Sequence, residues 1–561
     1  MTQDQNQKPT KDELIKENSN YLRGTIKEDL VKNTTHFEET NVKLLKFHGI
    51  YQQDNRDTRQ DRNAKSLEKE YSFMIRTKLP GGQLTSNQYL KLNEISEKYS
   101  NKTLRITTRQ TIQFHGVIKG DLHKTLNEIN KNLITTYGAC GDVVRNVLAC
   151  PVCDIDPDYS IDLLSLAKEI SNHLLPNTRS YYEVWVDEDK IDLRDKNDKE
   201  EEPIYGKTYL PRKFKIGLSL PHDNCIDVFT QDLGIVAIIN KNTISGFNIL
   251  IGGGLGHTHN KPETYPRLAS ELCFITQDKL INLLEQIVLI QKDYGKRTNR
   301  KHARLKYLID DKGIAWFQEE LEKRTGYKLD KCIPVNDYKA NDHIGWHKQN
   351  NNLWYLGLFI ENGRIKDSEK RKIKTGLKEI IKEFNPDIRL TPQQNIVLVN
   401  IKEEDKFKID KKLKEYNLFT IDTVSSLRRN SLACPALPTC GLALAEAERA
   451  LPNIIDELEK LGFSKEVLTI RMSGCPNSCS RPPVSELGII GTSTNKYNLY
   501  VGGDFEGTRL NKLFKENISG ENLSNEIASI FNVYRNNHNI NENFGDFCNR
   551  VGTEYLQTLI K

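Results

Sequence analysis

The sequence contains no long apolar run. Its longest apolar stretch is GIVAII at residues 234–239, whereas a helix that spans a membrane needs roughly 20 apolar residues. The N-terminal residues, MTQDQNQKPTKDELIKENSN, also lack the apolar segment of an export signal. We therefore expect a cytoplasmic protein that does not insert into a membrane.

An excess of one charge is missing as well. The 81 Lys and Arg residues are nearly balanced by 76 Asp and Glu residues, which gives a net charge of +5. A nucleic-acid-binding domain usually carries a concentrated basic excess, so we expect no nucleic-acid partner. Hydrophobic residues make up 37% and aromatic residues 8% of the chain, which is enough for folded cores. With 561 residues, the chain is long enough for several domain-sized units.

The eleven cysteines are an odd number and are spread thinly, which argues against a disulfide framework. Four of them form two short pairs, Cys434-x5-Cys440 and Cys475-x3-Cys479. Zinc sites usually combine such pairs with histidine, and no histidine lies between residues 434 and 479. Four thiolates are the ligand set of a [4Fe–4S] cluster. The alternative is four buried structural cysteines.

A helix is expected directly after Cys440. The run GLALAEAERALPNIIDELEKL at residues 441–461 has a helical pattern. Amides at the N-terminus of such a helix would favour a thiolate at Cys440.

The other cysteines are interpreted as structural. Cys150-x2-Cys153 has no second pair beside it. Because Cys150 aligns with Cys434, this pair resembles a decayed counterpart of the cluster loop, the segment that carries Cys434 and Cys440. Five more cysteines are isolated and are expected to be small buried residues: Cys140, Cys225, Cys273, Cys332 and Cys548.

The chain contains an internal repeat. The run RNVLACP at 145–151 returns as RNSLACP at 429–435. Three further matches follow in the same order: RITTRQTI (105–112) with RLTPQQNI (389–396), LPGGQL (79–84) with IENGRI (360–365), and NILIGGG (248–254) with NLYVGG (498–503). Matches in one order at nearly one spacing predict a duplicated unit and a pseudo-twofold molecule.

Basic side chains alternate along several predicted strands. A strand over residues 104–115 places six polar residues on one face: Arg105, Thr107, Arg109, Thr111, Gln113 and His115. Further along the chain, Lys213 and Lys215 flank Phe214 next to Arg212, and such like charges repel unless an anion lies between them. These faces are either solvated surface or the lining of a site for an anion.

The cysteine segments carry a family resemblance. SLACPALPTCGLALAEAERALP (431–452) and RMSGCPNSCSRPPVSELGIIG (471–491) resemble the cluster motif of the sirohaem and [4Fe–4S] nitrite and sulfite reductases. The resemblance extends over essentially the whole chain through SNYLRGTIKEDL (19–30), KFHGIYQQDNRDTR (46–59), TYLPRKFKIG (208–217) and GFNILIGGG (246–254). PALPTC and AEAER favour the NADPH-dependent assimilatory sulfite reductase hemoproteins over nitrite reductases with the same cysteine spacing.

The resemblance implies an α+β fold with a pseudo-twofold duplicated architecture. Two ferredoxin-like half-domains and two larger mixed α/β domains for sirohaem and the cluster are expected. The predicted segments are an N-terminal, partner-contacting arm (1–68), half-domain 1 (69–138), a cluster-type domain without a cluster (139–345), half-domain 2 (346–422), and the domain that binds the cluster and sirohaem (423–561).

The resemblance also implies the cofactors and the site. Cys434, Cys440, Cys475 and Cys479 would bind the [4Fe–4S] cluster, and Cys479 would also be the axial ligand of sirohaem. Arg76, Arg145, Lys213 and Lys215 are expected at the catalytic, substrate-facing side. The residues expected near sirohaem or substrate are Arg76, Arg105, Thr107, Arg109, Gln113, His115, Arg145, Arg212, Lys213, Lys215, Arg304 and Lys306.

The expected activity is the six-electron reduction of sulfite to sulfide in assimilatory sulfur metabolism and cysteine biosynthesis. The alternatives are a nitrite reductase of the same build and a nucleic-acid-binding protein with a structural cluster. The glycines at 252–256 have the wrong spacing for a dinucleotide site, so electrons must come from another protein. The resemblance implies a flavoprotein subunit that oxidises NADPH, with ferredoxin as the alternative donor.

Overall fold

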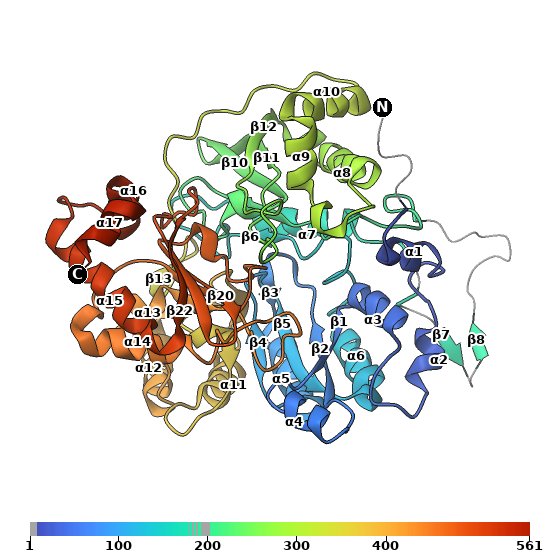
Figure 1. Ribbon diagram of the computed structural model, residues 1–561, viewed down its shortest axis with the longest axis horizontal. Helices are drawn as coiled ribbons and strands as arrows, with labels where there is room; N and C mark the ends of the chain where they lie inside the picture. The colour runs from blue at the N-terminus through green and yellow to red at the C-terminus, as the bar shows by residue number, and fades with distance from the viewer. Residues whose placement is uncertain (1–7, 179, 182–183, 187–188, 192–201, 561) are drawn as a thin grey trace.

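Figure 1 shows the fold as a computed structural model. It describes residues 8–178, 180–181, 184–186, 189–191 and 202–560. Within these ranges there are four five-stranded sheets and one two-stranded hairpin, formed by β7 (Val184–Val186) and β8 (Asp189–Ile191). The seven N-terminal residues of the predicted segment 1–68 lie outside the described residues.

Two of the sheets have the order expected for a pair of related half-domains. The first contains β1 (Ile50–Asp54), β2 (Tyr71–Arg76), β5 (Ile112–Val117), β4 (Leu104–Ile106) and β15 (Arg364–Ile365), in that order. The second contains β13 (Gly345–Lys348), β14 (Trp354–Leu358), β17 (Ile396–Ile401), β16 (Asp387–Leu390) and β3 (Gln83–Leu84). Each sheet therefore receives its edge strand from the other half of the chain.

Two equivalent glycines permit this exchange. Gly82 precedes β3 with φ +74°, and Gly363 precedes β15 with φ +71°. A Cβ on Gly82 would lie 2.7 Å from Leu390 O, and one on Gly363 would lie 2.3 Å from Ile106 O. Only glycine combines the left-handed backbone with so close an approach, which explains why LPGGQL returns as IENGRI.

Helices pack on both exchanged sheets and join them into one core. These helices are α5 (Ser86–Tyr99), α6 (Leu122–Lys131), α11 (Ile373–Phe384) and α12 (Lys406–Glu415). Thr85 begins α5 with a capping box, in which Thr85 and Gln88 satisfy each other's amides. Buried residues of both halves, such as Leu92 and Leu377, belong to a single hydrophobic cluster.

The two larger sheets repeat each other strand for strand. One has the order β6 (Leu148–Ala149), β9 (Ile216–Ser219), β10 (Leu233–Asn240), β11 (Thr243–Ile251) and β12 (Ser270–Ile275). The other has the order β18 (Ser431–Ala433), β19 (Ile470–Ser473), β20 (Leu487–Ser493), β21 (Lys496–Val501) and β22 (Lys512–Ser519).

The first three strands of each larger sheet are parallel and the last two are antiparallel. The register is the same too, because Ala149 pairs with Leu218 as Ala433 pairs with Met472. The predicted α+β duplication is confirmed. Further helices along the chain are α7 (Leu163–His173), α8 (Gln277–Tyr294), α9 (Leu305–Lys312), α10 (Ile314–Thr325), α13 (Ser426–Arg429), α14 (Leu451–Leu458), α15 (Leu523–Asn537), α16 (Phe544–Val551) and α17 (Thr553–Leu559).

The described part of the N-terminal segment packs against the body of the protein. It forms α1 (Lys11–Glu17), α2 (Ile26–Leu30), α3 (Glu39–Leu45) and α4 (Arg59–Ala64), and contributes β1 to the first sheet. Lys16 of α1 is buried, donates to Leu210 O at 2.7 Å and lies 3.4 Å from Asp142. In Figure 1 these blue helices lie alongside α6 and the first sheet.

Candidate cofactor site

The four paired cysteines follow two neighbouring strands. Cys434 follows β18 directly and Cys475 follows β19 after Gly474. Because β18 and β19 are parallel neighbours, their carboxyl ends meet at one edge of the sheet. All eleven cysteines lie in the described part of the chain and are free thiols.

The surroundings of these thiols fit a cluster. Gly474 N donates to Cys434 Sγ at 3.4 Å, and Asn477 Nδ2 donates to Cys475 Sγ at 3.5 Å. Burial and the neighbouring Cys479 raise the pKa of Cys475 to about 11, and the same two causes raise the pKa of Cys434 and Cys440. Thiols that oppose one another's ionisation need bound metal to exist as thiolates.

Among the described residues, these four thiols do not form a group compact enough to share a single ion. Within the described ranges, the one group of ligand atoms close enough to share an ion lies elsewhere in the chain. Cys434 and Cys475 are buried, Cys440 is half-buried and Cys479 is exposed. The exposed thiol is the one that the resemblance assigns to a second metal. Its backbone is held by Thr108, whose Oγ1 donates to Cys479 O at 3.0 Å.

The expected helix at residue 441 is a wrong prediction. The chain forms turns from Gly441 to Ala450, and α14 begins at Leu451. Leu444 N and Ala445 N both donate to Gly474 O, at 2.8 and 3.0 Å, so these amides bond across to the other cysteine loop instead of along a helix.

Arg56 holds the cluster loop from outside, and the sequence pattern gave no reason to select it. Its Nη1 donates to Cys440 O at 3.3 Å and to Ala443 O at 3.3 Å, and its own N–H donates to Pro438 O at 3.0 Å.

The predicted strand 104–115 is two strands, which is a second correction. β4 and β5 pair as a hairpin, and the turn between them contains Gln110 with φ +52°. The polar residues therefore lie on two strands, but Arg105 and its cross-strand partner Gln113 still share one face of the sheet. Thr107 closes the turn by bonding Thr111 Oγ1 at 2.7 Å. Gln113 pairs across the sheet with both Arg76 and Arg105.

Arg105 and His115 lie on the cluster side of this hairpin. Arg105 Nε donates to Glu448 at 3.0 Å, and its Nη2 donates to Ala433 O at 3.0 Å, beside Cys434. Burial and the nearby Arg364 lower the pKa of His115 well below its usual value, so its imidazole is neutral. Its Nδ1 is buried without a hydrogen-bond partner.

Three of the four predicted catalytic side chains are electrostatic neighbours of Cys479. Burial opposes the charge of Arg76, but nearby Cys140 and Cys479 raise its pKa. Burial and Arg212 lower the pKa of Lys213 well below its usual value. Burial and Arg109 lower the pKa of Lys215 to about 7; Cys479 opposes both of these lysine shifts.

Protein encloses these cations on most sides but leaves part of each uncovered. Arg76, Arg212, Lys213 and Lys215 are only half-buried by exposed area, although burial is the largest influence on each pKa. A group of cations around one exposed thiol, each with an uncovered face, fits a macrocycle that carries several carboxylates.

Arg145 lies in the loop after Cys140, and Arg212 lies in the segment that precedes β9. Arg145 is buried and its Nε donates to Gly141 O at 2.6 Å. Burial and Arg300 lower the pKa of Arg212 to about 10. The Asp142 carboxylate lies 4.0 Å from Arg212 and supplies a nearby counter-charge.

Arg109, Arg304 and Lys306 already have protein partners. Arg109 donates to Gln231 Oε1 at 2.7 Å, and Arg304 forms a paired contact with Asp232 at 2.6 and 3.1 Å. Lys306 Nζ donates to two backbone carbonyl groups at 3.0 Å. These three side chains therefore hold the loops of the site in place. Of their nitrogen atoms, Arg109 Nε is buried without a hydrogen-bond partner.

Lys78 is a residue that the sequence pattern left out. Its Nζ is buried without a hydrogen-bond partner. Burial and the nearby Arg145 lower its pKa to about 7. The signal that could have selected it is its spacing of two residues from Arg76, although Lys78 lies beyond the end of β2.

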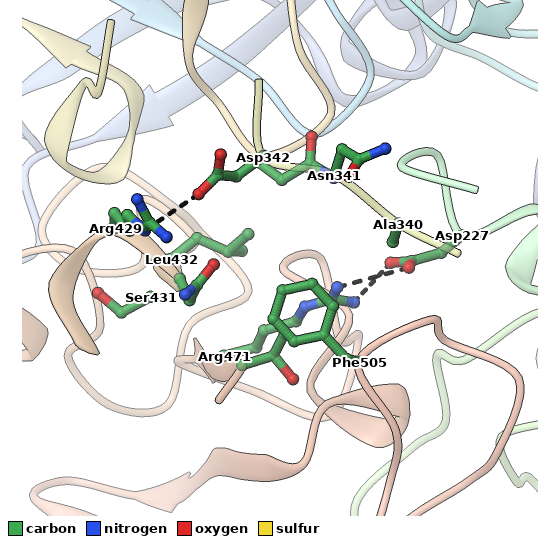
Figure 2. Close-up of a pocket in the computed structure, with 12 residues that line it drawn as sticks. Asp227, Ala340, Asn341, Asp342, Arg429, Ser431, Leu432, Arg471 and Phe505 are labelled. Carbon is green, nitrogen blue, oxygen red and sulfur yellow. Dashed lines mark hydrogen bonds and ion pairs between the residues drawn. The ribbon is translucent and has the colours of Figure 1, made fainter. Parts of the chain in front are cut away.

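A separate pocket lies at the junction of the two halves (Figure 2). Two ion pairs border it, Asp227 with Arg471 at 2.5 Å and Asp342 with Arg429 at 3.1 Å. Its lining residues in the described part of the chain include no predicted site residue, so it is distinct from the predicted site.

Two sequence families match the chain. The family described as "Nitrite and sulphite reductase 4Fe-4S domain" matches residues 140–329 and 425–561. The family described as "Nitrite/Sulfite reductase ferredoxin-like half domain" matches residues 66–132 and 347–416.

Similar proteins match over nearly the full length. The sulfite reductase [NADPH] hemoprotein beta-component of Oceanobacillus iheyensis is 46% identical, with 96% of this chain and 94% of that protein covered. The protein of the same name from Anoxybacillus flavithermus is 47% identical, with coverage of 97% and 96%. The structure of the Mycobacterium tuberculosis NirA protein has a TM-score of 0.80 at 23% identity, covers 98% of each chain and shows the same fold.

Within the described ranges, no helix combines the length and the apolar character that crossing a bilayer requires.

Proposed function

The chain belongs to the nitrite and sulfite reductase family, and from this premise we propose that it reduces sulfite to sulfide with six electrons. The single observation that carries the proposal is the exposed Cys479 thiol, which joins the cysteine group to the cation group. When bound, a [4Fe–4S] cluster coupled to sirohaem supplies electron storage and a site for the sulfur atom.

The four cysteines would hold the cluster. The backbone positions Cys434 and Cys475, because they follow two parallel strands. The Arg56 side chain holds Cys440 through its carbonyl oxygen. Cys479 would be shared with sirohaem, and the cations around it would bind the sirohaem carboxylates.

Arg76 and Arg145 would bind the sulfite oxygens. Two guanidinium groups neutralise a dianion and stabilise the charge that develops as S–O bonds weaken. A guanidinium presents a rigid fork of donors that matches oxyanions, so the role proposed for both arginines is to orient and stabilise the substrate.

Lys213 and Lys215 would deliver protons. Each of the three oxygens of sulfite leaves as water, which requires proton donors next to the substrate. A lysine with its pKa lowered to about 7, as for Lys215, releases its proton near neutral pH far more readily than an ordinary lysine.

The electron donor is proposed to be a flavoprotein subunit that oxidises NADPH. Two relatives that are 46% and 47% identical to this chain support this donor, because each is named as the hemoprotein beta-component of an NADPH sulfite reductase. Ferredoxin is the competing donor. We also propose a cytoplasmic location, which the eleven free thiols support. Turnover with NADPH and the flavoprotein, against turnover with reduced ferredoxin, distinguishes the donors, and cell fractionation tests the location.

The activity is tested on the purified protein with reduced methyl viologen. Sulfite-dependent oxidation with stoichiometric sulfide release is the expected result, together with sirohaem absorbance and acid-labile sulfide. A higher kcat/KM for nitrite than for sulfite would favour the nitrite reductase alternative. Absence of sirohaem and of labile sulfide after expression with both assembly pathways would refute the proposal.

A further inference from the structure

A second group of potential metal ligands lies in the first half of the chain. The side chains of Cys150, Asp223, Cys225 and His343 bring four ligand atoms within 4.8 Å of one another. In a tetrahedral site with Zn–S bonds of about 2.3 Å the ligand atoms lie about 3.8 Å apart, so small inward movements within this limit let one ion contact all four.

Three separate segments build this group. Cys150 follows β6 directly, and Asp223 and Cys225 lie in the loop after β9. Since β6 and β9 are parallel neighbours, both positions lie at the same edge of the sheet. His343 comes from the segment that precedes β13, where it has φ +57°.

Backbone contacts fix the segment that carries His343. Asn224 N donates to Lys339 O at 2.5 Å, and Lys339 N donates to Pro221 O at 3.0 Å. Arg429 binds Asp342 at 3.1 Å, as Figure 2 shows. The imidazole is therefore placed by the surrounding backbone and an ion pair.

The four side chains are buried, and two of their polar atoms have no hydrogen-bond partner. Exposed fractions are 1% for Cys150, 4% for Asp223, 0% for Cys225 and 5% for His343. Asp223 Oδ1 and His343 Nε2 have no hydrogen-bond partner. Asp223 Oδ2 accepts from Cys150 Sγ at 2.8 Å and lies in ion-pair range of His343 Nε2, at 3.0 Å, so three of the four ligand groups already meet at this carboxylate. Buried polar atoms without partners are uncommon and call for a ligand.

The two cysteines are the repeat counterparts of two cluster ligands. Cys150 follows Ala149 as Cys434 follows Ala433, and these alanines have the same register in their sheets. Cys225 lies six residues after Ser219, as Cys479 lies six residues after Ser473. Both serines end equivalent strands, β9 and β19.

We propose that Cys150, Asp223, Cys225 and His343 form a buried tetrahedral zinc site. Two thiolates, one imidazole and one carboxylate are ordinary zinc ligands, and a site with four protein ligands and no open position is structural. The ion cross-links the loops after β6 and β9 to the segment that leads into the second half of the chain.

The chemistry of the pocket favours zinc over the alternatives. An imidazole and a carboxylate replace two of the sulfurs that an iron–sulfur cluster requires. Cys225, which is isolated in the sequence, is buried as expected and is also a spatial neighbour of Cys150.

The test is the metal content of the full chain with its native cofactors, washed with EDTA to remove surface ions. About one zinc per chain is expected, because structural zinc is bound tightly. Zinc-edge X-ray absorption is expected to give about two sulfur ligands at about 2.3 Å and two lighter ligands at about 2.0–2.2 Å.

Variants locate the ion. Cys225→Ser and His343→Gln are each expected to lower zinc at least about tenfold, with iron and acid-labile sulfide unchanged. Cys273→Ser is the matched control, because Cys273 is also fully buried, in β12, but lies outside the group. Unchanged zinc in that variant is expected.

Several results would overturn the proposal, including some from the wild-type protein alone. These are zinc below about 0.1 per chain after growth with added zinc, a zinc spectrum without sulfur ligands, an iron atom in this site in place of zinc, or a Cys150–Cys225 disulfide in a non-reducing peptide map. Zinc retained in a Cys150→Ser/Cys225→Ser protein would also refute it. Because zinc is measured apart from sulfite turnover, the outcome does not depend on the proposed function.

Discussion

Asp227 and Arg481 occupy equivalent positions in the two halves of the molecule and form an ion pair with each other, at 2.5 Å. Asp227 lies two residues after Cys225, and Arg481 lies two residues after Cys479. Each precedes a short 3-10 helix with a left-handed backbone, at φ 50° and φ 63°. The repeat thus places opposite charges at the two copies of one position, where they meet across the pseudo-twofold axis.

Arg481 also joins the two half-domains. Its Nη1 donates to Thr108 O at 3.3 Å and its Nη2 donates to Pro392 O at 3.1 Å, and these carbonyls occupy matching positions of the two repeated hairpin turns. Since Thr108 also holds Cys479, this arginine links the cluster loop to both halves.

Replacing Asp227 by alanine is expected to destabilise the protein strongly. The change leaves Arg471 and Arg481 buried without their shared carboxylate, and breaking a buried pair typically costs about 3–5 kcal/mol. The control is Asp57→Ala, which breaks an exposed pair with Arg449 and should cost less than about 1 kcal/mol. Thermal unfolding at one scan rate measures both. Equal midpoints for the two variants would contradict the role of Asp227.

Replacing Cys475 by serine is expected to remove the cluster. Iron and acid-labile sulfide should each fall by about four atoms per chain, and sulfite turnover should be lost. Cys548→Ser is the control, since this buried thiol lies away from the cysteine loops in α16. An equal loss of sulfide in the control would show that the loss reports misfolding and not ligation.

Replacing Lys213 by alanine is expected to lower kcat without loss of sirohaem. Loss of a proton donor typically reduces turnover by about 10²–10⁴-fold, whereas the other cations remain to bind the macrocycle. Lys207→Ala is the control, because Lys207 is exposed in the same segment and its loss should leave kcat unchanged. Full activity with full sirohaem absorbance in Lys213→Ala would exclude the proposed role.

Lys78 is expected to make the stability of the protein depend on pH. Its pKa is about 7 in the folded protein and 10.5 in the ordinary state. Between these two values only the unfolded chain binds the proton, so the contribution of Lys78 to stability rises as the pH increases from about 7 to about 10. At lower pH both states bind the proton, and the folded state bears the cost of a buried ammonium.

The measurement is the difference in thermal midpoint between wild type and Lys78→Met at several pH values. The advantage of the methionine variant should be largest below pH 7 and should shrink toward pH 10. Since Lys215 titrates in the same range but is present in both proteins, the difference isolates Lys78. A constant difference across the range would show that the Lys78 ammonium is not buried at a cost.

Some elements have local causes. The capping box at Thr85 and the glycine turn at 80–82 depend on residues that are close together in the chain. The pattern failed where long-range contacts replaced local ones. Residues 441–450 have helical propensity, but their amides bond to Gly474 of another loop. The boundaries of the five predicted segments and the roles of the basic residues stay predictions.

The sequence by itself determined the duplication, the two cysteine pairs and the family, because these depend on the identity of residues and on their spacing along the chain. Only the tertiary structure decided which charges meet. Cys225 and His343 lie far apart in the chain but belong to one buried group. Asp227 of the first repeat copy forms an ion pair with Arg481 of the second. Contacts of this kind are fixed by how parallel strands and repeated halves pack, and no local pattern encodes them.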